Sequence, residues 1–98
     1  MSLPVVLRHK AAEELLAACD YLEAQREGLS IRLIGEIRRV IDRISTYPEL
    51  HGIVLEDIRR AAVRRFPYSI FYRVTSTRID VLAVFHDSRD PSEWQRRA

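Results

Sequence analysis

The sequence predicts one α+β domain, in which an N-terminal strand and an antiparallel helical hairpin pack on a small, mainly antiparallel β-sheet. Two observations carry this prediction. Apolar residues recur every three or four positions between residues 10 and 47, which is the period of an amphipathic helix. Residues 68–75 instead alternate between two faces, and a second aliphatic run follows at 79–85, which together indicate a β-hairpin. The predicted order of elements is β-α-α-β-β-β over residues 1–98.

Length and composition indicate a folded protein in a reducing compartment. A chain of 98 residues is expected to bury roughly 60 to 70 % of its unfolded surface, which suits a single domain. No apolar run approaches the about 20 residues of a membrane span, and the first residues lack a secretory signal, so we expect a cytoplasmic protein without membrane contacts. The one cysteine, Cys19, closes no internal disulfide, and no spacing of ligand residues resembles a metal site. We expect no metal and no other cofactor.

The net charge of +2 hides an uneven distribution of charge along the chain. Residues 58–98 carry nine arginines and four acidic residues, whereas residues 1–57 carry seven basic and ten acidic residues. The planar guanidinium group of arginine pairs in two-pronged fashion with carboxylates and phosphates. The charge pattern therefore admits a nucleic-acid partner and an acidic protein partner equally.

The first strand is predicted at residues 3–7, where Pro4 suits the start or the edge of a sheet because it lacks an amide hydrogen. A helix is predicted from Lys10, and Gly28 is expected to end it. Its apolar face comprises Ala12, Leu15, Leu16, Cys19 and Leu22. Its solvent face is expected to carry Glu13, Glu14, Asp20, Glu23 and Glu27.

A second helix is predicted from Ser30, as its N-cap, to Tyr47, and Pro48 stops it. The apolar stripe comprises Leu33, Ile34, Ile37, Val40, Ile41, Ile44 and Tyr47. Two amphipathic helices with so short a connection fold back on each other as an antiparallel hairpin. Residues 49–57 are predicted to form a loop.

The next strand is predicted at residues 58–66, although the basic run within it also suits a helix. Extended structure is preferred because Phe66 precedes Pro67, and a residue before proline avoids helical geometry. The hairpin follows, with its turn at 75–77. After Pro91 a last short helical turn is expected, which carries Trp94.

This layout predicts a sheet face that the helical hairpin leaves uncovered. The helices are expected to take the side of Val81, Ala83 and Phe85, and strict alternation then turns Phe71, Leu82 and Val84 to solvent. Each exposed side chain forgoes roughly 1.5 to 3 kcal/mol that burial supplies. We expect a partner to cover this face. The alternatives are that the C-terminal turn with Trp94 folds over it, or that the chain tolerates scattered exposed apolar side chains.

The two most specific motifs are Arg64–Val74, which reads RRFPYSIFYRV, and His86–Trp94, which reads HDSRDPSEW. With the order of elements, they resemble the RelE/ParE superfamily of type II toxin-antitoxin toxins over nearly the whole chain. The resemblance implies a RelE/ParE-like fold and a growth-inhibiting toxin that a cognate antitoxin neutralises. We assign antitoxin binding to the predicted uncovered face, at Phe71, Leu82 and Val84, and expect the free chain to self-associate through that face.

The superfamily has two branches, and the resemblance favours the ParE-like one, which is associated with plasmid stabilisation and with poisoning of DNA gyrase. The other branch cleaves mRNA on the ribosome and usually has an arginine where this chain has Ser69. Arg60 and Arg64 partly match that branch and Arg89 matches it, but Trp94 cannot replace its C-terminal tyrosine in proton transfer. We assign target binding to Arg60, Arg64, Arg65, Arg89 and Trp94. A ribosome-dependent mRNA endoribonuclease remains the alternative, and an inactive antitoxin-binding member is the third.

His86 is the residue on which the enzymatic alternative depends. Its pKa lies near 6.5 when unperturbed, which suits a general acid or base, and Arg64, Arg65 or Arg89 could then hold a phosphate. The structural alternative is that His86 ends a buried strand and bonds with Asp87, Asp90 or the backbone. We favour the structural role, so the catalytic candidates His86, Arg64 and Arg89 belong to the alternative function only.

Overall fold

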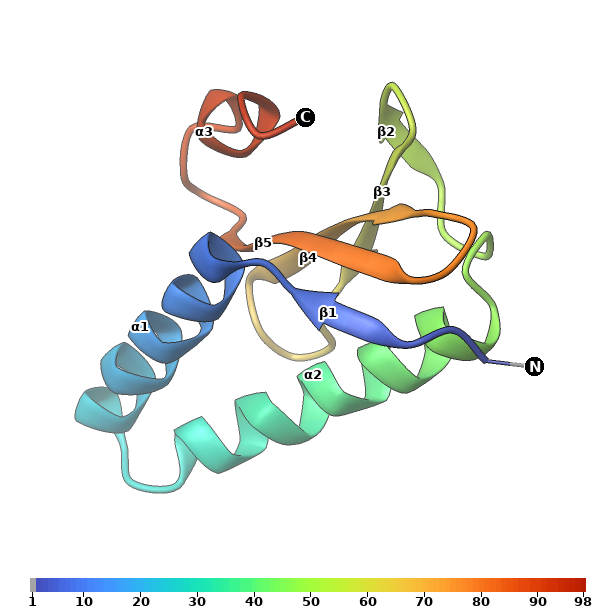
Figure 1. Cartoon of the computed structure of the whole chain (residues 1–98). Helices are drawn as coiled ribbons and strands as arrows, with labels where there is room; N and C mark the ends of the chain where they lie inside the picture. Colours follow the sequence, from blue (N-terminus) through green and yellow to red (C-terminus); the bar gives the residue numbers. More distant parts are fainter. Residues whose placement is uncertain (1) are drawn as a thin grey trace.

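A computed structural model describes residues 2–98 and confirms the predicted α+β class (Figure 1). The helical hairpin lies under the sheet, and the C-terminal segment lies on the opposite side (Figure 1). The elements follow the order β1 (Val5–Leu7), α1 (His9–Gln25), α2 (Leu29–Thr46), β2 (Ile53–Leu55), β3 (Ile58–Ala62), β4 (Tyr68–Val74), β5 (Ile79–His86) and α3 (Ser92–Gln95).

The five strands form one mixed sheet in the order β1-β5-β4-β3-β2. Strand β1 pairs in parallel with β5, and the other neighbours are antiparallel. The edge strand β2 lies within the segment 49–57 that the sequence predicts as a loop, so that prediction was wrong for Ile53–Leu55. Strand β3 ends at Ala62 rather than Phe66, because the chain turns at Arg65, whose φ of 69° is left-handed.

The helix boundaries agree with the prediction to within a few residues, but the predicted cap does not form. Gly28, with φ 90°, caps α2, and Ser30 lies inside the helix. The amide and hydroxyl of Ser30 instead donate to the Glu23 carboxylate over 3.1 and 2.7 Å, and the Gly28 amide donates to it over 3.0 Å. These hydrogen bonds lower the pKa of Glu23, and the bond from the Gly28 amide has the largest effect.

A β-bulge in β5 changes which side chains face the helices. Phe71 of β4 pairs with Ala83, whereas the next residue, Tyr72, pairs with Val81, so that Leu82 has no partner. An extra residue reverses the alternation beyond it. Val81 and Val84 consequently both belong to the core beneath the helices, while Leu82, Ala83 and Phe85 belong to a second core on the other face. The predicted division of β5 into two alternating faces was therefore wrong.

The second core is closed by the C-terminal helix α3. Trp94 stacks on Phe71 with ring centroids 3.9 Å apart, and Trp94 is 5 % exposed. Phe71 is 5 % exposed and Leu82 1 %, so neither faces solvent. Val84 is 1 % exposed on the helix side. The prediction of an uncovered face at Phe71, Leu82 and Val84 was wrong, because the chain covers it with its own tryptophan.

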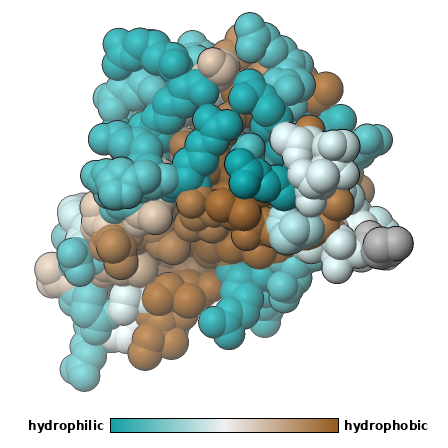
Figure 2. All heavy atoms as spheres, viewed as in Figure 1, coloured by the Kyte–Doolittle hydropathy of each residue, from teal (hydrophilic) through white to brown (hydrophobic). Residues whose placement is uncertain are grey.

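Exposed apolar side chains lie elsewhere on the molecule. In the view of Figure 1, apolar residues form a band across the middle of the surface, with hydrophilic residues above it (Figure 2). The large exposed ones are Val6, Leu16, Tyr21, Ile31, Ile34, Tyr47, Leu50, Ile53 and Val54. Four of these nine lie within the short segment 47–54, which leads into the edge strand β2.

No helix within the described residues 2–98 is long and apolar enough to span a bilayer. Over the same part of the chain, no three potential ligand side chains gather into a metal site. Cys19 packs half-buried against the core beneath the helices, and burial raises the pKa of its thiol.

Candidate functional site

A chain of polar groups crosses the sheet where β5 ends. Arg60 of β3 donates through Nε to the Ser69 hydroxyl on β4 over 2.9 Å, and that hydroxyl donates to Asp87 Oδ1 over 2.6 Å. A second nitrogen of Arg60 lies 3.7 Å from the same carboxylate oxygen. Ser69 is fully buried, so the position that usually holds an arginine in the ribonuclease branch serves a structural network here. Asp87 therefore forms a partly exposed ion pair with Arg60.

Arg89 is held by two carboxylates and one aromatic ring. Its guanidinium donates to Glu14 Oε2 over 3.1 Å and forms an ion pair with Glu93. The guanidinium carbon also lies 4.4 Å from the centre of the Phe85 ring, within the range of a cation–π contact. Burial opposes the charge, but the bonds to Glu93 and Glu14 outweigh it and raise the pKa of Arg89.

Glu14 is a buried acid that the sequence places on the solvent face of its helix, and that prediction was wrong. Its carboxylate accepts bonds from Arg97 over 2.8 and 3.0 Å and from the Val84 amide over 3.2 Å, in addition to Arg89. The available signal was helical spacing, because position 14 follows Ala11 by three residues and precedes Ala18 by four. Glu14 thereby ties the C-terminal segment to α1 and β5.

His86 is engaged by its own turn. The Ser88 amide donates to Nδ1 over 3.1 Å, and the Ser88 hydroxyl lies 2.8 Å from the same atom. Nδ1 therefore accepts a hydrogen bond from the backbone of its own turn. The ring also meets Tyr68 edge to face, with centroids 5.1 Å apart. The predicted structural role is consistent with this, and of the predicted partners it is the backbone, through the Ser88 amide, that bonds to the ring rather than Asp87 or Asp90.

The catalytic candidates do not share one hollow. His86 and Arg89 line a hollow of about 160 Å³ with Glu14 and Tyr68. Arg64 lines a different hollow, together with Arg39 and Arg43 of α2. Burial raises the pKa of Tyr68, which keeps its hydroxyl protonated at neutral pH.

The five residues assigned to target binding are likewise divided between two surfaces. Arg60, Arg89 and Trp94 line a hollow of about 220 Å³ where β5 ends, together with Phe71, Phe85, Asp87 and Pro91. Arg64 and Arg65 lie in the turn between β3 and β4 and face α2 instead. We call the first hollow the C-terminal hollow. Sequence proximity in β3 and the following turn does not reveal this division.

Comparison with known proteins gives the family of the chain. The family model described as the ParE toxin of the type II toxin-antitoxin system, parDE, matches residues 5–91. A chain of the solved "Chromosomal ParDE TA system from P. aeruginosa" superposes with a TM-score of 0.75 at 18 % identity, covering 87 % of this chain and 96 % of that one. No curated protein matches the sequence significantly. The resemblance inferred from the two motifs is confirmed, and this chain belongs to the ParE toxin family of type II toxin-antitoxin systems.

Proposed function

We propose that the protein inhibits growth by binding a macromolecular target, with DNA gyrase as the first candidate, and that a cognate antitoxin neutralises it. The supporting observation is that two of the three catalytic candidates, His86 and Arg89, are already engaged, while the third, Arg64, lines a separate hollow. Asp87 holds Arg60, Glu14 and Glu93 hold Arg89, and Ser88 holds His86 Nδ1. A surface of this kind is suited to contact with a partner rather than to proton transfer.

The C-terminal hollow is the proposed target contact. The side chains of Arg60 and Arg89 are 43 % and 39 % exposed, so each keeps part of its guanidinium available beyond its acid partner. Aromatic rings of Phe71, Phe85 and Trp94 form the floor. Arginine beside aromatic side chains is the composition that recurs at the energetic centres of protein interfaces.

The antitoxin is proposed to bind the exposed apolar residues that lead into β2, rather than Phe71, Leu82 and Val84. An antitoxin that reached Phe71 and Leu82 would have to displace Trp94, and Val84 lies beneath the helices. Ile53 and Val54 are 54 % and 48 % exposed on an edge strand, whose outer backbone groups can pair with an added strand. Self-association of the free toxin is proposed to use this same edge.

The ribonuclease alternative rests on the hollow that brings together His86, Arg89, Tyr68 and Glu14. A pair of assays separates it from the proposal: inhibition of gyrase supercoiling, and cleavage of mRNA in a coupled translation reaction. We expect the purified toxin to inhibit supercoiling, Arg89→Ala to weaken that inhibition, and His86→Ala to leave it nearly unchanged.

Site-specific mRNA cuts that disappear with His86→Ala would establish the enzymatic alternative instead. A toxin that inhibits no supercoiling, cleaves no mRNA and is not toxic on expression, but still binds its antitoxin, would be an inactive member of the family.

A further inference from the structure

We propose that a groove between α2 and the β3–β4 turn binds the sugar-phosphate backbone of a nucleic acid. The groove comprises two adjoining hollows of about 610 and 80 Å³, which share Glu36 and Arg39. We call it the arginine groove, after the six arginines that line it: Arg26, Arg32, Arg39, Arg43, Arg64 and Arg65. This site is separate from the C-terminal hollow and does not depend on the identity of the toxin's target.

The structure sorts its arginines into two groups. Six form ion pairs with acidic side chains: Arg8, Arg60, Arg73, Arg78, Arg89 and Arg97. Arg59 donates to two backbone carbonyls. Of the eight others, which lack an acid partner within residues 2–98, six line the arginine groove. The groove therefore gathers most of the uncompensated positive charge of the molecule.

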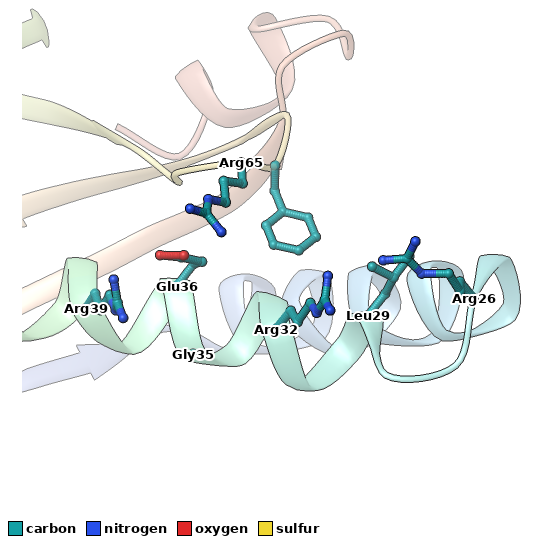
Figure 3. A pocket seen from close by; sticks show the side chains of 8 residues that line it. Arg26, Leu29, Arg32, Gly35, Glu36, Arg39 and Arg65 are labelled. Atoms are coloured by element: carbon teal, nitrogen blue, oxygen red, sulfur yellow. The ribbon is translucent and has the colours of Figure 1, made fainter.

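Figure 3 shows the larger hollow of the groove, with Arg65 on the opposite wall from α2. Arg65 extends from the turn toward Glu36 on α2, and Arg32 and Arg39 flank Glu36 along the helix. Glu36 is the one acid in the lining of the two hollows, and none of the six guanidiniums lies within ion-pair distance of it. It offsets part of the charge, and five positive charges remain in excess.

The spacing along α2 suits a linear polyanion. Arg32, Arg39 and Arg43 follow one another at axial intervals of roughly 10 and 6 Å, given the rise of a helix. Arg64 and Arg65 add charge from the opposite wall. Guanidinium groups bind phosphate oxygens through two parallel hydrogen bonds, so a run of phosphates can be held from both sides.

The lining of the groove favours a nucleic acid over an acidic polypeptide. None of the nine large, exposed apolar side chains of the molecule lines either hollow. The apolar members of the larger hollow, Leu29 and Phe66, are themselves half-buried. Protein interfaces need a buried apolar centre, whereas nucleic-acid interfaces are polar and strongly positive. The groove has the second character.

Gly35 leaves room for close approach to this wall of the groove. Glycine is the least favourable helix residue after proline, yet Gly35 lies in the middle of α2 and lines the groove. A Cβ built at this position meets no atom within 4 Å. Packing within the chain therefore does not require glycine here. The missing side chain leaves space in which a ligand backbone can lie against α2.

The test is fluorescence anisotropy of the full chain with four short labelled probes: single-stranded DNA, duplex DNA, single-stranded RNA and a polyglutamate peptide. We expect at least one nucleic acid to bind, and polyglutamate to bind more weakly. Comparison of the three nucleic-acid probes shows whether the groove binds single-stranded DNA, duplex DNA or RNA most tightly. The affinity should fall steeply between about 50 and 200 mM salt, because bound phosphates release counterions.

Two variants with a matched control locate the binding. Arg32→Gln with Arg39→Gln should lower affinity about tenfold or more and reduce the salt slope by about 2, since each phosphate contact contributes about 1. Arg38→Gln with Arg96→Gln removes the same charge from exposed, unpaired arginines outside the groove and should have a much smaller effect. Gly35→Met should weaken binding without a change of charge and without lowering the melting temperature.

Equal losses in the groove and control pairs would mean general charge attraction and would overturn the proposal. So would tighter binding of polyglutamate than of every nucleic acid, or unchanged affinity in Gly35→Met. Because these assays contain neither gyrase nor an antitoxin, their outcome is independent of the proposed toxin activity.

Discussion

The indole of Trp94 lies on the ring of Phe71, with centroids 3.9 Å apart and planes inclined by 16°. This pair converts a sheet face that would otherwise need a partner into the interior of the free chain. The covering helix α3 is only four residues long, so the tryptophan side chain does most of the covering.

Replacing Trp94 by alanine should lower the free energy of unfolding by about 3 to 5 kcal/mol, the usual cost of deleting a buried aromatic side chain. The second core would then open to solvent. Urea unfolding measures the loss, and increased binding of a hydrophobic dye reports the exposed face. Arg96→Ala changes an exposed neighbour in the same turn and should change stability by less than about 0.5 kcal/mol. Equal stability of the parent and Trp94→Ala would mean that α3 does not cover the sheet in solution.

Glu14→Gln should destabilise the fold by about 3 kcal/mol, because it leaves Arg97 and Arg89 without their shared buried counter-charge. Thermal and urea unfolding measure this effect. The control is Glu13→Gln on the same helix, whose side chain is 53 % exposed and pairs only with His9. An equal, small change in both variants would show that the Glu14 network contributes little.

Stability should fall at acidic pH partly through Glu23. Its folded-state pKa is lowered by bonds from Gly28 and Ser30, so its contribution is present above the unfolded pKa and is lost as the pH falls from about 4.5 through the folded value. In Glu23→Gln this part of the acid dependence should disappear, whereas Glu27→Gln should retain it. A carbon-detected titration of the carboxylates measures the pKa directly. A Glu23 value at or above the ordinary one would contradict these bonds.

Ile53→Asp should weaken antitoxin binding about tenfold or more, because a charge would replace a contact at the centre of the proposed interface. Its effect on the free fold should be small, since Ile53 is 54 % exposed. Ile31→Asp is the matched control, as Ile31 is 74 % exposed but lies on α2 away from β2. Titration calorimetry with the purified antitoxin compares the two. If Ile31→Asp alone weakens binding, the antitoxin covers the helical hairpin and not the β2 edge.

The sequence by itself determined the class of fold, the order of its main elements and the family. These follow from local causes: the period of three to four in α1 and α2, the alternation in β4, the stop at Pro48 and the two motifs that resemble ParE toxins. Each of these signals depends on residues that are close in the chain, so no knowledge of distant contacts is needed to recognise them.

Only the tertiary structure decided which side chains are buried and which arginines are available. One unpaired residue, Leu82, reverses the alternation of β5, and a bulge leaves no mark in the pattern of an all-apolar strand. Glu14 is inside because two arginines from the far end of the chain meet it there. Arg60 and Arg64 are only four residues apart, yet Arg60 pairs with Asp87 while Arg64 faces α2 across a groove. Pairing of charges depends on distances in space that chain order does not encode.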